Sequence, residues 1–175
     1  LATTLVARRY NPTMPWWVLI PAAYLIDIAM FTLVALGIER MDPIEGYDGP
    51  ALSGSIIDMT FSHDLIPQVF WIALAGALTF ALTRNRRFAI VAMALTVVHY
   101  LCDLISGYGH FVYGTDSHAL GTDWYINNLL AAVSCEALLG AVCVYIFVRN
   151  RDFSVVRQVA LFSFFGLIPF VFLAV

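Results

Sequence analysis

The chain contains 175 residues, of which 61% are hydrophobic and only 12% are charged, and its mean hydropathy is +0.84. Because a water-soluble domain typically carries about 25% charged residues, this composition argues against a soluble protein and indicates one of the lipid bilayer. The formal net charge is −3 and no stretch is strongly basic, so a nucleic-acid partner is not expected. We therefore expect an all-α fold, a polytopic transmembrane helical bundle that forms a single domain over residues 1–175.

Five segments are apolar and long enough to cross the hydrocarbon core, which takes about 20 helical residues. In chain order they are residues 15–38, 64–83, 88–106, 124–148 and 154–175. The connection over residues 39–63 is rich in Pro and Gly, which predicts an irregular loop that rests on the membrane surface or dips into it. The connection over residues 107–123 lies on the same side. Ser62 is expected to cap the second helix, and Pro169 is expected to kink the fifth.

The basic residues are distributed unequally between the two sides of the predicted bundle. All nine are arginines, and only Arg40 falls in the loops 39–63 and 107–123. The other eight precede the first span, join the second to the third, or join the fourth to the fifth: Arg8, Arg9, Arg84, Arg86, Arg87, Arg149, Arg151 and Arg157. Because basic residues are retained on the cytoplasmic side, we expect the N-terminus in the cytoplasm and both of these loops outside.

A few ionisable side chains lie inside the predicted spans or at their ends. They are Asp27, His63, Asp64, His99, Asp103 and Glu136. Such groups cost about 2.5–3.5 kcal/mol each at the centre of a membrane helix, so they indicate function by default. At a rise of about 1.5 Å per residue, Asp27 and Glu136 fall near mid-membrane and the others between there and the outer interface. This distribution predicts one polar site that opens toward the outside.

The residue types and their spacing favour a metal site. His99 and Asp103 are four residues apart, so they share one helix face and can ligate the same ion. A set of imidazole and carboxylate donors suits a divalent metal, zinc first. We predict His63, His99 and Asp103 as metal ligands, with Asp64 beside them. A desolvated carboxylate, Asp27 or Glu136, is expected to act as the general base.

A structural interpretation of the same residues stays open. A hydrogen bond between His99 and Asp103 can simply satisfy two buried polar groups, and His63 with Asp64 can be the exposed start of a helix that is favoured by the helix dipole. His110 and His118, in the loop 107–123, are expected to be solvated rather than ligands.

The order of three segments, "LIDIAMFTLVALGIER", "FSHDLI" and "VVHYLCDLI", followed by a fourth span with a buried glutamate, resembles a group of bacterial inner-membrane proteins. That group is similar to the YdjM-type membrane-bound metal-dependent hydrolases. The resemblance covers most of residues 1–148 and implies a bacterial inner (cytoplasmic) membrane location. It also implies that the family's site residues correspond to Asp27, His63, His99, Asp103 and Glu136. Here "SHD" replaces the family's SHS, and the DxDH and HRGxTH elements of the better-known hydrolases are missing, so the resemblance supports a metal site more than a particular reaction.

Three functions are compatible with these observations. The first is a metal-dependent hydrolase with an outward-facing site that acts on a lipid or a lipid-linked substrate. The second is a non-catalytic accessory subunit of a larger membrane complex, which packs on other membrane protein chains or contacts a pigment, a haem or a quinone. The third is a transporter in which Asp27 and Glu136 relay protons. The lipid bilayer is the expected partner in each case.

Overall fold

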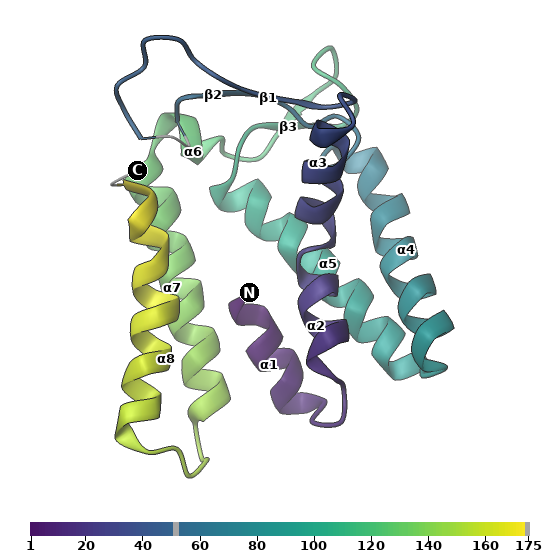
Figure 1. Ribbon diagram of the computed structural model, residues 1–175, viewed down its shortest axis with the longest axis vertical. Coiled ribbons are helices and arrows are strands. Elements are labelled where there is room, and N and C mark those ends of the chain that lie inside the picture. The colour runs from purple at the N-terminus through teal and green to yellow at the C-terminus, as the bar shows by residue number, and fades with distance from the viewer. Residues whose placement is uncertain (51–52, 174–175) are drawn as a thin grey trace.

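The computed structural model describes residues 1–50 and 53–173, and most of them are helical (Figure 1). The helices are α1 (Ala2–Tyr10), α2 (Trp16–Ala23), α3 (Leu25–Ala35), α4 (Leu65–Thr83), α5 (Arg86–Ser106), α6 (Trp124–Asn127), α7 (Leu129–Val148), α8 (Val155–Leu167) and the 3-10 helix η1 (Ile168–Leu173). Four short strands complete these elements: β1 (Arg40–Pro43), β2 (Ser55–Asp58), β3 (His110–Phe111) and β4 (Ala119–Leu120). The helical class expected from the sequence is therefore correct, except for two small sheets.

Among the described residues, three helices are long and apolar enough to cross a membrane, namely α4, α5 and α7. The first predicted span, residues 15–38, is not one straight helix. It consists of α2 and α3, which are bent by 62° at Tyr24 and would together make a fourth crossing. Pro21 lies inside α2, and proline removes a backbone donor and clashes with the preceding turn. The sequence predicted the length of this segment correctly but not its break.

The last two predicted spans also differ from the structure. Residues 124–148 are divided at Asn128, whose extended backbone (φ −159°) ends α6 and whose side chain accepts from the amide of Ala131 to begin α7. The fifth segment forms an α-helix of only 13 residues, α8, and then tightens into η1. Pro169 explains this change, because it cannot donate to the carbonyl of Phe165. Residues 174 and 175, which were included in this span, lie outside the described residues.

Both connections that are predicted to lie outside contain short antiparallel hairpins rather than only irregular chain. In the first, β1 pairs with β2 and places Arg40 opposite Asp58. In the second, β3 pairs with β4 and places His110 opposite Leu120. The two hairpins lie together at one end of the molecule, over the ends of α3, α4 and α5 (Figure 1). They form a polar cap above the helices.

The helices pack as two groups joined by α1. In one group, Leu19 of α2 is fully buried against Ala92 and Leu95 of α5, and α4 packs along the other side of α5. Gly76 of α4 allows this approach, since a Cβ there would lie 2.7 Å from the Met93 side chain. In the other group, α7 packs against α8 and also against Leu5 of α1. The C-terminal end of α5 approaches α6 and α7 near the polar cap (Figure 1). A cavity lined by residues of α3, α5, α7 and α8 lies between the two groups.

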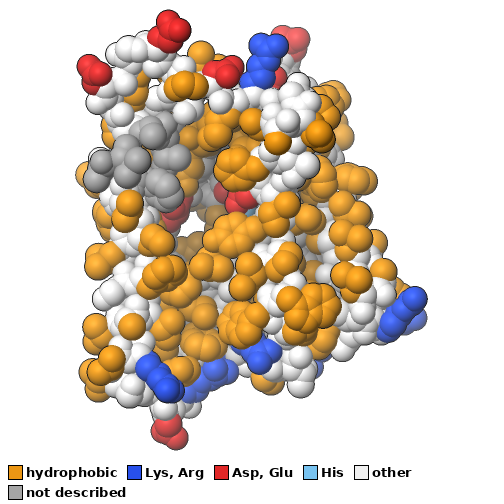
Figure 2. All heavy atoms as spheres, viewed as in Figure 1, with side chains coloured by type: hydrophobic (Ala, Val, Ile, Leu, Met, Phe, Trp, Pro, Cys, Tyr) orange, Lys and Arg blue, Asp and Glu red, His pale blue; other side chains and the backbone are white. Residues whose placement is uncertain are grey.

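The two ends of the molecule differ in charge. Figure 2 shows arginines at the end opposite the hairpins and most of the acidic side chains at the hairpin end. Arg9 contributes to the fold at the basic end, because its guanidinium donates to the carbonyls of Phe147 and Arg149 at the C-terminus of α7. This separation of charge is the one that the arginine distribution predicts for a protein with a cytoplasmic N-terminus.

Cysteine labelling tests the predicted orientation. Asp116 and Asp152 are exposed acidic residues at opposite ends of the molecule. In right-side-out membrane vesicles, a membrane-impermeant maleimide should label Asp116→Cys strongly and Asp152→Cys only after the vesicles are opened. The unmodified protein, with Cys102, Cys135 and Cys143, provides the background. Labelling of Asp152→Cys alone in sealed vesicles would reverse the orientation.

Candidate metal centre

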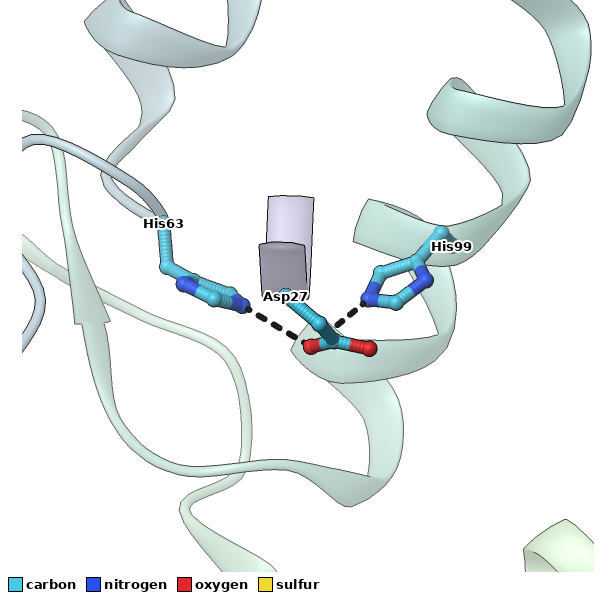
Figure 3. Close-up of side chains that lie close together, drawn as sticks. All are labelled: Asp27, His63 and His99. Atoms are coloured by element: carbon cyan, nitrogen blue, oxygen red, sulfur yellow. Dashed lines mark ion pairs between the residues drawn. The ribbon is translucent and has the colours of Figure 1, made fainter. Parts of the chain in front are cut away.

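The break between α2 and α3 positions the first ligand candidate. The break leaves the carbonyls of Ala22 and Ala23 without their helical N–H donors. Side chains of α5 bind these two carbonyls instead. The Thr96 hydroxyl donates to the Ala22 carbonyl at 3.0 Å, and His99 Nδ1 contacts the Ala23 carbonyl at 2.5 Å. A carbonyl can only accept, so His99 Nδ1 carries a proton and Nε2 points away from the helix break. The next turn of chain, α3, places Asp27 opposite this ring (Figure 3).

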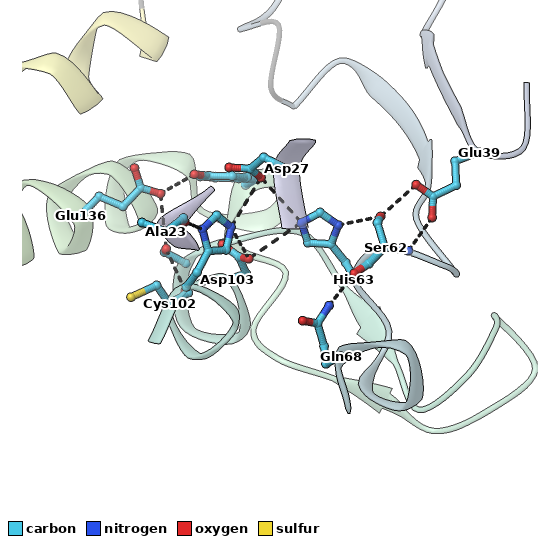
Figure 4. A network of polar contacts seen from close by, with 12 residues as sticks. Ala23, Asp27, Glu39, Ser62, His63, Gln68, Cys102, Asp103 and Glu136 are labelled. Atoms are coloured by element: carbon cyan, nitrogen blue, oxygen red, sulfur yellow. Dashed lines mark hydrogen bonds and ion pairs between the residues drawn. The ribbon is translucent and has the colours of Figure 1, made fainter. Parts of the chain in front are cut away.

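A buried chain of hydrogen bonds orients the second histidine, His63. Glu39 is only 1% exposed, and its Oε1 accepts from the amides of Phe61 and Ser62 while its Oε2 accepts from the Ser62 hydroxyl. Because the one hydroxyl proton of Ser62 goes to Glu39, Ser62 Oγ accepts from His63 Nδ1 at 2.8 Å. Gln68 of α4 also donates to the Ser62 carbonyl. His63 Nε2 is thereby directed toward Asp27 and Asp103 (Figure 4).

Two histidine nitrogens and two carboxylates converge at one place. His99 Nε2 lies 3.1 Å from Asp103 Oδ2 and 3.4 Å from Asp27 Oδ1, and the corresponding distances from His63 Nε2 are 3.9 and 3.7 Å. The donor atoms of Asp27, His63 and His99 all lie within 4.8 Å of one another. The convergence expected of His63, His99 and Asp103 is therefore present, and Asp27 joins them.

Asp27, His63 and His99 form a donor group that could hold a divalent ion, and Asp103 lies beside them. Donors that each lie about 2.0–2.1 Å from a tetrahedral zinc are roughly 3.3 Å apart, which is close to the distances between these imidazole and carboxylate atoms. With Nδ1 of each ring protonated, Nε2 has either a lone pair for a cation or a second proton for a carboxylate. Asp103 Oδ2 is buried and forms no hydrogen bond with the described residues. A cation between Asp27, His63 and His99 would satisfy these three acceptors. Hydrogen bonds to Nδ1 are the usual support of metal-bound histidines.

Asp64, which was expected beside the ligands, does not lie in this group. Its carboxylate is buried, but Oδ1 accepts from the amide of Phe111 at 2.9 Å and Oδ2 accepts from the amide of Gly114 at 2.6 Å. These bonds hold the β3–β4 hairpin over the start of α4. Ser62 likewise does not cap α4, whose N-cap is Asp64, and instead orients His63.

Glu136 lies apart from the four donors. Figure 4 shows it beyond Asp103, on the side away from His63. The carboxylate Oε1 accepts from the hydroxyl of Tyr125 and, at 3.3 Å, from the hydroxyl of Ser106. Glu136 therefore forms a second polar group with residues of α5 and α6, and both groups line the same cavity.

His110 is buried, although it was expected to be solvated. Its ring is 2% exposed and stacks on that of His63, with centroids 5.6 Å apart and planes within 7°. Neither ring nitrogen forms a hydrogen bond with the described residues. Burial, and after it the neighbouring His63, lowers the pKa of His110 to about 4. His110 is therefore neutral at physiological pH and covers the outer side of His63.

The donors and Glu136 share a cavity of about 450 Å³ between the two helix groups. Its walls include Leu139 of α7 and Phe164, Phe165 and Ile168 of α8 and η1. Figure 2 shows the corresponding hollow on one face of the molecule, with acidic side chains inside it and hydrophobic side chains around it. The polar site is thus open to the side of the helical bundle, at the level of its apolar surface.

Sequence reasoning missed three features that support the site. Glu39 begins the predicted irregular loop 39–63, yet it is the buried acceptor that orients Ser62 and through it His63. His110 gave no signal beyond being a loop histidine. The Ala23 carbonyl carries no side-chain signal at all.

Substitution of Asp103 and of Asp64 distinguishes a metal ligand from a residue that anchors the β3–β4 hairpin. Asp103→Asn should lower zinc content, because it replaces a negatively charged ligand with a neutral side chain of similar shape. Asp64→Asn should keep zinc but lower the unfolding free energy by about 1–3 kcal/mol, since one buried backbone amide loses its acceptor. Elemental analysis and thermal unfolding in mild detergent measure both quantities. Equal loss of zinc in the two variants would contradict this division of roles.

Ser62→Ala tests the orientation of His63. The variant removes the acceptor of His63 Nδ1 and should weaken zinc binding by about 10–100-fold, the usual effect of losing such a partner. Ser106→Ala is the matched control, because Ser106 is also buried beside the cavity but contacts Glu136. Competition with a chelator gives both affinities. Unchanged affinity in Ser62→Ala would show that His63 needs no such support or is not a ligand.

Comparison of the chain with protein-family models, curated proteins and solved structures finds no match. The resemblance to the YdjM-type hydrolases therefore stays an expectation from the motifs. What bears on function is the geometry of the site: four convergent donors, a separate glutamate and a laterally open cavity.

Proposed function

We propose that this protein is a membrane-embedded, metal-dependent hydrolase. The observation that carries the proposal is the convergence of two imidazole nitrogens and two carboxylate oxygens within 3.1–3.9 Å, with both histidines held by Nδ1. His63, His99, Asp27 and Asp103 would hold the ion, and zinc suits this donor set best. When bound, such an ion supplies Lewis acidity and lowers the pKa of a coordinated water toward about 7.

Residues of the chain supply the other functions that hydrolysis needs: a general base and shielding from bulk water. Asp27 lies among the donors, which favours it as a ligand rather than as the general base. Glu136 is then the carboxylate that accepts a proton from water and returns it to the leaving group. Tyr125 and Ser106 hold Glu136 toward the cavity through their hydroxyl groups. His110 and the polar cap shield the outer side of His63 from bulk water.

The orientation proposed for the molecule places this site in the outer half of the membrane. The hairpin end carries most of the acidic residues and the opposite end most of the arginines (Figure 2). The site lies near the hairpin end, below the polar cap. A bacterial inner membrane, with the site facing outward, is the location that this proposal requires.

Metal content and Glu136→Gln test the proposal together. Protein purified in mild detergent should contain about one zinc per chain. In vesicles that contain ester, amide and phosphoester lipids, it should hydrolyse one class in a zinc-dependent manner. Glu136→Gln should keep the zinc and lose about 10²–10⁴-fold in rate, as expected for a general base. Protein without metal that co-purifies with other membrane chains would favour the accessory-subunit function instead.

A further inference from the structure

The cavity combines acidic groups with an absence of arginine and lysine from its described lining. Asp27, Asp103 and Glu136 contribute three carboxyl groups, and His63, His99 and His110 contribute imidazoles. No arginine lies among the described residues that line it, and the chain has no lysine. The arginines are instead concentrated at the opposite end of the molecule, apart from Arg40 (Figure 2).

This charge balance selects against an anionic substrate. Asp27 and Asp103 alone neutralise a divalent ion, and Glu136 adds a further acidic group to the same cavity. A phosphate monoester would bring additional negative charge into a partly desolvated site with no arginine to pair with it, which is strongly unfavourable. An uncharged carbonyl group carries no such cost, and it can still be polarised at the site. The complementary reacting group is therefore a carboxylic ester or an amide.

The walls of the cavity define the rest of the substrate. Leu139, Phe165 and Ile168 form an apolar side that continues onto the surface of α8 and η1. Phe164 and Ile168 are half exposed there, at 50% and 45%. Gly140 lets α8 approach α7 closely, since a Cβ would lie 2.3 Å from the Phe165 carbonyl. A volume of about 450 Å³ is within the usual range for a ligand site, and a hydrocarbon chain can extend sideways from it into lipid.

Building on the proposed hydrolase function, we propose that the substrate is an uncharged long-chain acyl ester or amide that reaches the donors sideways from the bilayer. In the reaction, the oxygen of water bonds to the carbonyl carbon and the bond from that carbon to the ester oxygen or amide nitrogen breaks. The proton that Glu136 takes from water passes to the leaving oxygen or nitrogen. The products are a fatty acid and a free alcohol or amine, and no other reactant is consumed.

Photo-crosslinking in phosphatidylcholine vesicles tests binding independently of turnover. The two probes are a diacylglycerol and a phosphatidic acid that carry the same diazirine-labelled acyl chain and differ only in the anionic phosphate. The diacylglycerol should label the wall formed by residues 164–169 about tenfold more than the phosphatidic acid, a factor that one unfavourable charge interaction readily produces. Mass spectrometry locates the labelled peptides.

Two neighbouring substitutions on α7 provide the matched control. Leu139 lines the cavity, whereas Leu138 is 66% exposed on the outer surface of the same helix. Leu139→Trp should fill the apolar side and reduce diacylglycerol labelling severalfold, and Leu138→Trp should leave it unchanged. Zinc content should be normal in both variants, because neither residue is one of the donors.

Equal labelling by the two probes would overturn the choice of an uncharged substrate. Equal labelling of the Leu139→Trp and Leu138→Trp variants would overturn the placement of the acyl chain. Zinc analysis of the same samples separates these outcomes from a failure of the hydrolase proposal. Protein that lacks zinc but retains the probe preference and the Leu139 effect would contradict the hydrolase, while it would support the site for an uncharged acyl lipid.

Discussion

The site depends on the hydrogen bonds from side chains of α5 to two backbone carbonyls at the end of α2. In an apolar environment, each unsatisfied carbonyl costs several kcal/mol, so a broken membrane helix needs replacement donors. Thr96 and His99 are three residues apart on one face of α5 and supply them to Ala22 and Ala23. The same contacts fix the direction of α3 and hence of Asp27. One helix break therefore creates the acceptor that orients His99 and also brings the carboxylate that faces it.

The second histidine is supported differently, by a polar chain that runs from the cap into the helices. Glu39 is buried yet accepts three hydrogen bonds, from two backbone amides and the Ser62 hydroxyl. A buried carboxylate is tolerable only with such compensation. This chain of hydrogen bonds fixes the tautomer of His63. Both imidazoles therefore present Nε2 to the centre of the site. The cap and the broken helix thus support the two sides of one site, although they lie in separate parts of the sequence.

The two helix groups contribute different parts of the site. The α2–α5 group supplies the convergent donors, whereas α7 and α8 supply Glu136 and the apolar wall. The groups touch through α1 near the basic end, and Ser106 of α5 reaches Glu136 of α7 near the cap. The cavity between them opens at the level of the apolar surface (Figure 2). A polar centre that opens at the level of the apolar surface suits the lipid substrate that we propose.

The sequence by itself determined the helical class, three of the long helices and the short list of ionisable residues from which the site is made. These follow from local properties: hydrophobic length for α4, α5 and α7, and the high cost of a charged group in an apolar segment for His63, His99, Asp27 and Asp103. Only the tertiary structure decided which of those residues meet. The i, i+4 spacing placed His99 and Asp103 on one face, but it carried no information on the partner across the bundle. Asp64 and His63 are adjacent in sequence, yet hydrogen bonds to the β3–β4 hairpin turn Asp64 away while Ser62 directs His63 inward. Backbone acceptors such as the Ala23 carbonyl have no sequence signature, because every residue carries one, and long-range packing alone determines which of them is left free.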